Sequence, residues 1–331
     1  MSRLTEMAAT SHTLSVAALE EASRVGQRTA DIDHLLLALV VSAQDAGQVL
    51  RSLGITLASA REAVAEQHAD QLASLGITAP APEPGRITFH ETGGQEWGER
   101  PLEVIRRSAD GDRRGDAAAV LRELLDEPSG FIDQVLRRLG TTPDAVRARL
   151  DEVERHPTLP PADAGSPLSG SAQGFAAAPV EAVWALLADP SRMPEWDPAT
   201  GAVEDAPTSA AIGSTWTGRL HTRRADGRPL RVKPERRRTR IEVVDVEEHQ
   251  LIGWRLTWPD APKTNARRIR IALEPAAGGT QLRIDLAWEP DAHRRPSPLA
   301  VVVRWLVRPL TRLAIWMQTT QIAAAISRAF R

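Results

Sequence analysis

The stretch "APVEAVWALLADPSRMPEWDP", residues Ala178–Pro198, sets the pattern of the second half of the chain. A helix is expected to begin near Pro179, because the first turn of a helix needs no backbone N–H from a proline. A second, short helix should end at Trp196. A short strand precedes these helices and alternating segments follow them, and this order of elements indicates an α+β domain.

Five segments after the two helices alternate apolar and polar residues in the manner of half-buried strands. The turn signals "ADGRP" and "AAGG" lie between segments. A long helix at about residues 298–330 closes the chain. The expected strands are Gly213–Arg223, Thr239–Glu248, Gln250–Trp258, Asn265–Pro275 and Thr280–Pro290.

The opening stretch and this order of elements resemble the START-like or SRPBCC superfamily, in the branch named polyketide cyclase/dehydrase. The resemblance covers about residues 170–330. It implies a helix-grip fold, in which an antiparallel sheet curls around the last helix and encloses an apolar cavity. The fold alone names no activity, since it serves lipid carriers, hormone receptors, cyclases, toxins and chaperone activators.

Strand alternation predicts which side chains would face such a cavity. Ile269, Ile271 and Leu273 mark the inner face of one strand, and tryptophans from neighbouring strands would share that face. Such a wall suits an aromatic or polycyclic ligand, and the alternative is that the tryptophans fill the space themselves. The ligand-cavity candidates are Trp196, Trp216, Trp254, Trp258, Trp288, Ile252, Leu256 and Ile284.

Groups for catalysis are scarce. The chain has no cysteine and no tyrosine, which excludes disulfides, thiolate nucleophiles, cysteine-based metal sites and phenolic acids. A cyclase or dehydrase needs a general acid or base at its ligand. The histidines of this half, His221, His249 and His293, have no evident buried carboxylate partner, and Asp285 points away from the inner face. No catalytic residue, metal site or cofactor is therefore predicted.

The first half of the chain contains a repeat. The hexapeptide "VLRSLG" at Val49–Gly54 returns as "VLRRLG" at Val135–Gly140. Helical patterns surround both copies in the same order, which indicates an internal duplication of an all-helical unit. The block "DHLLLALV" (Asp33–Val40) is too continuously apolar for a surface helix, so it should form a central, buried one. Thr56 or Ser59 is a candidate cap of a later helix.

These blocks resemble the N-terminal repeat domain of Clp-type chaperone ATPases. The resemblance implies two four-helix repeats, at about residues 3–77 and 86–154. In that family the domain receives substrates or adaptors, so the implied partner is a Clp-type chaperone or protease, or its substrates. The ATPase motor is missing, because the chain contains no G-x-x-x-x-G-K-[ST] phosphate loop.

In some members of that family, the acidic residue before the "HLLLAL" block helps to hold a phosphorylated arginine. This chain keeps Asp33 in the first repeat and has Ala118 in the second. A guanidinium needs a carboxylate partner, so the resemblance implies at most half of that function, and the alternative is that Asp33 caps its helix. The protein-binding candidates are Asp33, Leu36 and Leu121.

The expected organisation is a helical domain at 1–155, a proline-rich linker at 156–169 and a ligand-binding domain at 170–331. Through His156 the chain carries 17 arginines and 25 acidic residues, a net charge of −8. The remainder carries 24 basic and 18 acidic residues, a net charge of +6. Arg223–Arg240 is rich in arginine but lacks interleaved aromatic residues, so a solvated hairpin is favoured over a nucleic-acid site. A third possibility is that this basic arm docks on the acidic helical half of the same or another chain.

The N-terminus lacks the apolar core of a signal peptide. The most apolar stretch, Leu299–Trp316, carries three arginines, whereas a membrane span wants about 20 nearly uncharged residues. We therefore expect a cytoplasmic protein without a membrane span. The leading hypothesis is a non-enzymatic protein whose cup binds an apolar or aromatic small molecule while its helical repeats bind a protein. The alternatives are a polyketide cyclase/dehydrase-like enzyme and a chaperone-activator-like protein.

Overall fold

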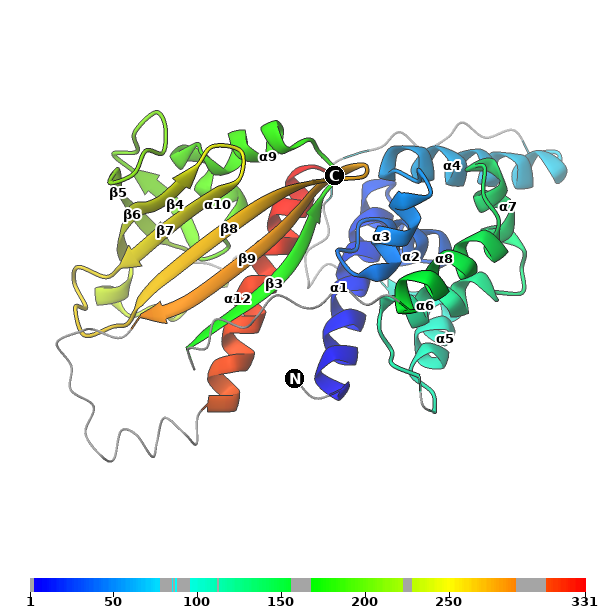
Figure 1. Ribbon diagram of the computed structural model, residues 1–331, viewed down its shortest axis with the longest axis horizontal. Helices are drawn as coiled ribbons and strands as arrows, with labels where there is room; N and C mark the ends of the chain where they lie inside the picture. Colours follow the sequence, from blue (N-terminus) through cyan, green and yellow to red (C-terminus); the bar gives the residue numbers. More distant parts are fainter. Residues whose placement is uncertain are drawn as a thin grey trace. The chain divides into compact units, whose positions relative to one another are not determined.

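The computed structural model describes residues 3–77, 85, 87, 96–111, 113–155, 168–222, 228–289 and 308–331. The chain divides into two compact units, Met1–Leu159 and Pro160–Arg331 (Figure 1). Several predicted features lie outside the described residues. They are most of the linker (156–167), part of the arginine-rich stretch (223–227), His293 and the start of the last predicted helix (298–307).

The first unit is helical in its described residues. Its two short strands, β1 (Thr29–Ala30) and β2 (Glu96–Trp97), pair in parallel. The relation of its two halves as a four-helix repeat stays a prediction. The helices are α1 (Arg3–Arg24), α2 (Ile32–Val40), α3 (Asp45–Ser52), α4 (Leu57–Ser74), α5 (Glu99–Ser108), α6 (Ala117–Leu125), α7 (Phe131–Arg138) and α8 (Pro143–Arg155).

Helix α2 is the centre of this unit. All nine of its residues are buried, and it contacts α1, α4 and α6. The continuous apolar run explains this position, since a helix that is apolar on every side must be covered on every side.

Side chains cap two of the predicted helices. Thr56 and Ser59 form a reciprocal pair at the start of α4, with each backbone N–H donating to the other residue's hydroxyl oxygen. At the start of α2 the cap is Asp31, whose carboxylate accepts from the N–H of Ile32 at 2.8 Å. Asp33 lies inside the helix, so the alternative interpretation of Asp33 as the cap is wrong.

The second unit combines one sheet with three α-helices among its described residues. The helices are α9 (Val180–Leu187), α10 (Met193–Trp196) and α12 (Arg308–Ala329), with short 3-10 turns η1 (Pro190–Arg192) and η2 (Pro234–Arg236). The strands are β3 (Ser169–Ala176), β4 (Thr200–Glu204), β5 (Thr215–Leu220), β6 (Arg238–Glu247), β7 (Leu251–Thr257), β8 (Ala266–Ala276) and β9 (Gly279–Glu289).

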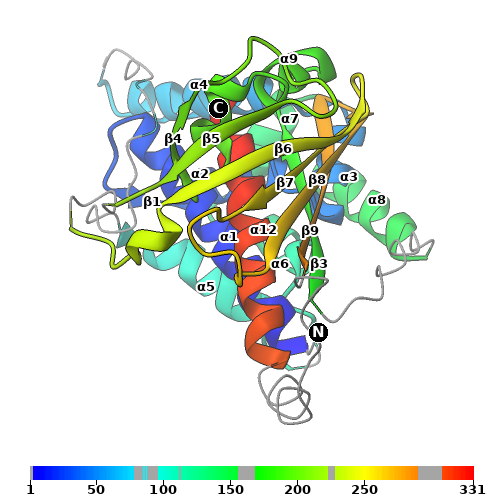
Figure 2. The ribbon, with the colours of Figure 1, turned by 90° about the vertical axis from the view of Figure 1, so that its left-hand side faces the viewer.

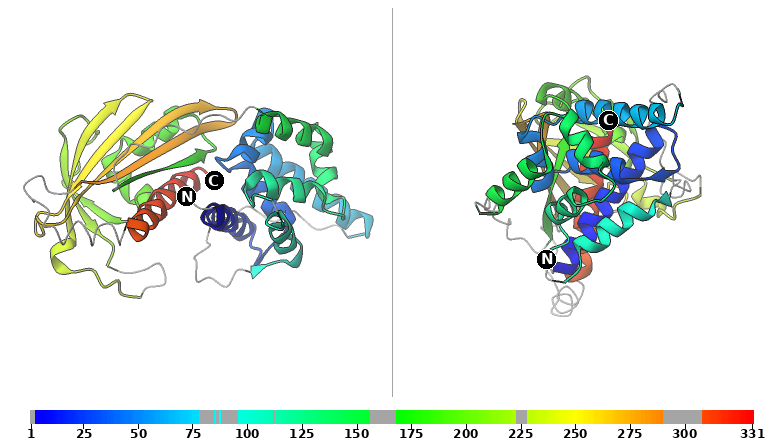
Figure 3. Two further views of the ribbon diagram at one scale, coloured as in Figure 1. Left: turned by 60° about the horizontal axis from the view of Figure 1, so that its bottom comes forward. Right: turned by 90° about the vertical axis from the view of Figure 1, so that its right-hand side faces the viewer.

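The seven strands form one antiparallel sheet in the order β3-β9-β8-β7-β6-β5-β4. Figures 2 and 3 show this sheet curving around α12. A curved antiparallel sheet closed by a long C-terminal helix is the helix-grip arrangement expected from the sequence. Strand β4 was not predicted, because its five residues "TGAVE" are too few and too small to show a clear alternation.

Alternation separates the two faces of the sheet. The outer face carries ion pairs, among them Arg268 with Asp245 at 2.9 Å and Arg255 with Glu289 at 3.0 Å. The inner face is apolar along the central strands, and α12 covers part of it. Its buried side chains include Ile252, Trp254, Leu256, Ile269, Ile271, Leu273, Leu282, Ile284 and Leu286.

Two glycines of β3 allow α12 to lie close to the sheet. A Cβ atom on Gly170 would come within 2.9 Å of the Cγ2 atom of Ile315, and one on Gly174 within 3.1 Å of the Cβ atom of Ala323. Both contacted residues belong to the buried stripe of α12. The absence of a side chain at these two positions therefore sets how closely α12 approaches the sheet.

Candidate functional site

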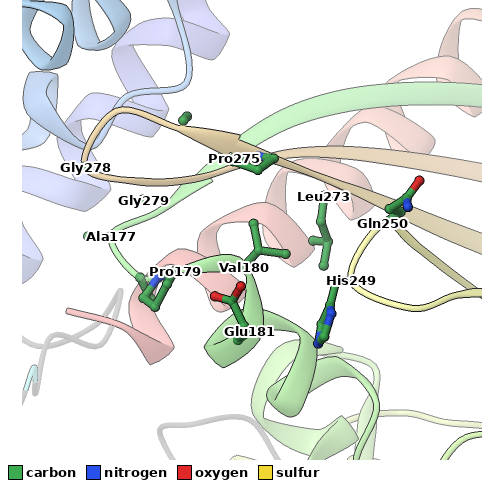
Figure 4. A pocket seen from close by; sticks show the side chains of 12 residues that line it. Ala177, Pro179, Val180, Glu181, His249, Gln250, Leu273, Pro275, Gly278 and Gly279 are labelled. Carbon is green, nitrogen blue, oxygen red and sulfur yellow. The ribbon is translucent and has the colours of Figure 1, made fainter.

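One surface depression of the second unit lies where three turns meet (Figure 4). It encloses about 640 Å³ between the start of α9, the β6–β7 turn and the β8–β9 turn. Glu181, His249 and Gln250 supply its polar side chains. His249 packs edge-on against Trp184, with ring centroids 5.7 Å apart. No hydrogen bond or ion pair joins Glu181 to His249 in the described part of the chain, so these two groups do not form an acid–base pair.

A second depression, of about 400 Å³, lies beside β5 and β6. Its lining is mostly polar, with Asp205, Arg238 and Arg240 among the residues. Arg238 already pairs with Asp260 at 2.8 Å. This surface is solvated and charged, so it does not fit the apolar ligand that the sequence predicts.

Seven of the eight predicted cavity residues lie in or beside the core of the second unit. Six of them are buried in that core: Trp196, Trp216, Trp254, Ile252, Leu256 and Ile284. Trp288 is half-buried and packs against them, and Trp258 is half-buried as well. The rings of Trp196 and Trp254 contact one another, with centroids 4.6 Å apart. Indole rings therefore occupy much of the inner face.

Strand register places an arginine among these side chains. Trp216 on β5 lies opposite Ile241, Ile241 opposite Leu256, Leu256 opposite Arg267, and Arg267 opposite Trp288. These five residues form one row across five strands, which we name the Arg267 row. Arg267 is only 6% exposed. A guanidinium thus stands on the inner face of the sheet, away from the ion pairs of the outer face.

Asp197 neutralises this buried charge. It follows α10 directly, is fully buried, and accepts from Arg267 Nη1 at 3.1 Å and 3.4 Å through its two oxygens. The hydroxyl of Thr200 donates to the same carboxylate at 2.7 Å. Burying a charge is costly unless it is paired and hydrogen-bonded. The pair therefore fixes the end of α10 to β8 and leaves the interior with no net charge at this point.

Several donors beside this pair meet no acceptor among the described residues. They are the indole Nε1 atoms of Trp196 and Trp258 and the Nε atom of Arg267, each buried. We name these three groups the donor cluster. The Nε1 atom of Trp216 is buried and unpaired as well, but Trp216 lies three strands away from Arg267. Buried polar groups in folded proteins nearly always have a partner, so these donors need an explanation.

Sequence reasoning missed Arg267 and Asp197. Arg267 has the same parity as Ile269, Ile271 and Leu273, so the alternation that marks the inner face of β8 also assigns the arginine to it. Asp197 has no such signal, because it stands at the irregular end of a four-residue helix.

The other candidate groups for chemistry are dispersed. His221 is exposed just after β5, and Asp285 is half-buried on the outer face, 3.3 Å from the Nε atom of Arg283. Within the described ranges, no group of three or more histidine, aspartate or glutamate residues is arranged to hold a metal ion.

In the first unit, the predicted protein-binding residues are buried. Leu36 and Leu121 are core residues with no exposed surface. The Asp33 carboxylate lies 2.8 Å from His68 Nε2 and accepts from the backbone N–H of His34 at 2.8 Å. Burial would raise the pKa of Asp33, but hydrogen bonds and charges from His34 and His68 outweigh it and hold that pKa well below its usual range.

Comparison with known families gives one match. Residues 171–314 match the family described as polyketide cyclase / dehydrase and lipid transport. The matched residues include the Arg267 row and Asp197. No curated protein matches the chain significantly.

Solved structures of bacterial proteins are similar to part of the chain. A protein of Chromobacterium violaceum is 18% identical over 46% of this chain and 99% of its own, with a TM-score of 0.29. A polyketide-cyclase-like protein of Corynebacterium glutamicum is 25% identical over 49% of this chain and 90% of its own, with a TM-score of 0.32. A protein of Arthrobacter aurescens is 18% identical over 48% of this chain and 86% of its own, with a TM-score of 0.34.

Among the helices formed by the described residues, none is both long enough and apolar enough to cross a membrane.

Proposed function

We propose that the second unit binds an apolar small molecule between the inner face of its sheet and α12, and that it does so as a carrier or sensor. The observation that carries this proposal is the Arg267 row with its tryptophans on the concave face. A wall of indole rings and branched aliphatic side chains offers a large apolar contact area to a flat ligand. The family match supports the proposal, because its description includes lipid transport.

A cyclase or dehydrase is the second candidate, and one observation favours it. Asp197 is a buried carboxylate beside Trp196, and a buried acid or base at the tryptophan wall is what such an enzyme requires. Its oxygens, however, already accept from Arg267 and Thr200. A general base needs a lone pair that is directed at the substrate, so Asp197 acts better as a counter-ion than as a base.

For the first unit we propose protein binding, as the Clp-like repeat pattern implies. Because Leu36 and Leu121 are core residues, the contact surface would use other side chains. Leu75 and Leu102 are 74% and 49% exposed and offer apolar contacts at the end of α4 and in α5. Crosslinking of the full-length protein to purified Clp-type chaperones, with Leu75→Ser and Leu102→Ser as variants, tests this assignment; unchanged crosslinking would contradict it.

Native mass spectrometry of the freshly purified full-length protein tests small-molecule binding first. A mass above that of the chain, which falls to the chain mass on extraction, would support the proposal and release the ligand for identification. An aromatic probe that quenches indole emission provides a second readout. Trp97 is the one tryptophan of the first unit, so quenching that persists in Trp97→Phe locates the probe in the second unit. No co-purifying compound and no saturable quenching would overturn the proposal.

A further inference from the structure

We propose that the donor cluster around Arg267 forms a subsite for an uncharged hydrogen-bond acceptor, such as a ketone or quinone oxygen on a flat apolar ligand. This inference rests on the proposed function of the second unit, and it adds which part of the ligand is recognised and what charge the ligand carries. It begins from the three buried nitrogen donors of the donor cluster, which meet no acceptor within the described residues.

The cluster contains donors only. An indole Nε1–H donates and cannot accept, and the same holds for a guanidinium Nε–H. A ligand that satisfies these groups must therefore bring oxygen or another acceptor atom. Leaving a buried donor unsatisfied costs a folded protein stability, so a ligand that supplies the acceptor gains affinity in addition to its apolar contacts.

Strand register brings donors close to Arg267. Leu256 lies directly opposite Arg267 on β7, and Trp258 follows two residues later, just past the end of that strand. Trp288 lies directly opposite on the other side. Trp196 precedes Asp197, which contacts the same guanidinium. Three tryptophans thus stand next to Arg267 or its partner Asp197 by register or sequence, and two of them, Trp196 and Trp258, carry unpaired donors.

Two half-buried indole rings beside the donor cluster indicate how a ligand reaches this subsite. Trp196 and Trp216 are at most 3% exposed, whereas Trp258 and Trp288 are half-buried and so retain contact with solvent. Both lie at the end of the sheet where β7 and β9 finish. A flat ligand that entered beside these two rings would bring its acceptor atom toward Arg267.

The Asp197 pair sets the charge of the ligand. Arg267 would attract a carboxylate if it were alone, but Asp197 already compensates its charge at 3.1 Å. An anionic ligand would add a second negative charge beside a buried carboxylate, and like charges in a low-dielectric interior repel strongly. A cationic ligand would add a positive charge beside Arg267 and would bring no acceptor to the donor cluster. The remaining class is a neutral molecule with an acceptor oxygen.

Three matched probes separate these possibilities in the full-length protein. They are 2-(hydroxymethyl)anthraquinone, which is neutral and carries ring carbonyls, 2-(hydroxymethyl)anthracene, which lacks those carbonyls, and anthraquinone-2-carboxylate, which carries the carbonyls and a negative charge. Affinities are measured by indole quenching and by isothermal titration calorimetry. We expect the neutral quinone to bind about 10-fold more tightly than the anthracene, because a hydrogen bond is worth on the order of that factor. It should also bind more tightly than the carboxylate, whose negative charge would lie beside Asp197.

Variants connect the preference to the donors. Trp258→Phe keeps an aromatic ring and removes the N–H. It should weaken binding of the neutral quinone about 3- to 10-fold, since one neutral hydrogen bond is worth roughly that factor. The affinity for the anthracene should change by no more than about 2-fold, because the anthracene has no ring carbonyl to accept that hydrogen bond. Trp184→Phe is the matched control, because Trp184 packs against His249 and is no member of the donor cluster. Thermal unfolding of each variant confirms that it is folded.

The outcomes separate this inference from the proposed function. Equal binding of the quinone and the anthracene, or equal losses for both in Trp258→Phe, would overturn the acceptor subsite and leave apolar binding intact; the donors would then serve ordered water only. Tighter binding of the carboxylate than of the neutral quinone would overturn the selection for a neutral ligand. Saturable binding of none of the three probes would overturn the proposed function itself.

Discussion

Arg267 Nη1 lies 3.1 Å from Asp197 Oδ1, and this buried ion pair joins strand β8 to the end of α10. The relationship has two consequences. It holds the short helix that carries Trp196 against the sheet, and it places a compensated charge inside an otherwise apolar face. The energetic role of the pair can be tested by removing Arg267 alone and by removing both partners together.

Removing Arg267 alone should lower the free energy of unfolding much more than removing both Arg267 and Asp197. Arg267→Met leaves the Asp197 carboxylate buried without its counter-ion, and we expect a loss of about 3–5 kcal/mol in the free energy of unfolding. The double variant Asp197→Asn with Arg267→Met should cost less than Arg267→Met alone, because no unpaired charge stays buried. Urea unfolding followed by indole emission measures these losses.

The outer face of the same sheet provides the control for this experiment. Arg255 pairs with Glu289 at 3.0 Å, but both side chains retain contact with solvent. Arg255→Met should therefore change the free energy of unfolding by no more than about 1 kcal/mol. Equal losses for Arg255→Met and Arg267→Met would show that burial of the Asp197 pair has no energetic consequence.

The alternation of apolar and polar residues predicted the inner face of the sheet, but it did not predict the Arg267–Asp197 pair. Ile252, Leu256 and Ile284 lie on that face as their period of two requires. Arg267 follows the same period, but an arginine is seldom assigned to a core. Asp197 reaches Arg267 from another element, and a contact between residues 70 positions apart in the chain has no local signal.

The repeated hexapeptide shows the same limit in the first unit. Arg51 and Arg137 occupy equivalent positions in "VLRSLG" and "VLRRLG". Arg51 is buried and donates through Nη1 to the carbonyl oxygens of Val40 and Ser42 at 2.6 Å and 2.8 Å. Arg137 is exposed and pairs with Asp133 on its own helix. Identical letters thus predict the same helix but not the same environment, because burial depends on what the rest of the unit places over each copy.

Gly47 should resist replacement by alanine, although it lies within α3. In an open helix, Gly→Ala stabilises by about 1 kcal/mol. Here an added Cβ would collide with the carbonyl oxygen of Ser42 and lie 2.7 Å from Arg51 Nη1. Burial already lowers the pKa of Arg51 to about 10. Displacing this guanidinium from the carbonyl oxygens would weaken hydrogen bonds of a buried charge, which is costly. We expect Gly47→Ala to destabilise by about 1–3 kcal/mol.

Gly54 is the control for the collision at Gly47. An added Cβ at Gly54 meets no atom within 4 Å, so its cost comes only from a φ of +82°. Gly54→Ala should therefore lower the free energy of unfolding by about 1 kcal/mol. Chemical unfolding followed by circular dichroism compares the two variants, and a Gly47→Ala variant that is more stable than the wild type would contradict the predicted collision.

The Asp33 carboxylate should give the first unit a stability that depends on pH in the acid range. Burial raises the pKa of Asp33, whereas His34 and His68 lower it more strongly, so its folded value lies below its unfolded value. The stabilisation is then fully present above the unfolded pKa, about 3.9, and declines as the pH falls from there through the folded pKa.

The variant Asp33→Asn measures this contribution. At pH 7 we expect the free energy of unfolding of Asp33→Asn to be about 2 kcal/mol lower than that of the wild type, since hydrogen bonds to a charged group are worth that much. This difference from the wild type should shrink below about pH 4. Asp133→Asn, on an exposed helix face, should show no such convergence. A wild-type advantage that grows as the pH falls from about 5 to about 3 would contradict the direction of the Asp33 pKa shift.

Ligand binding should protect one region of the chain from hydrogen exchange. At about 100 times its dissociation constant, a ligand that binds only the folded state adds about 2.7 kcal/mol to the stability of the unit that holds it. We expect 2-(hydroxymethyl)anthraquinone to slow exchange in peptides that cover α10, β7 and β8, where Trp196, Trp258 and Arg267 lie. Peptides that cover α2 serve as the internal control, because this helix belongs to the other unit and has no part in the subsite. Protection confined to the turns around His249 would instead place the ligand in the depression of Figure 4, at the opposite end of β7 from Trp258.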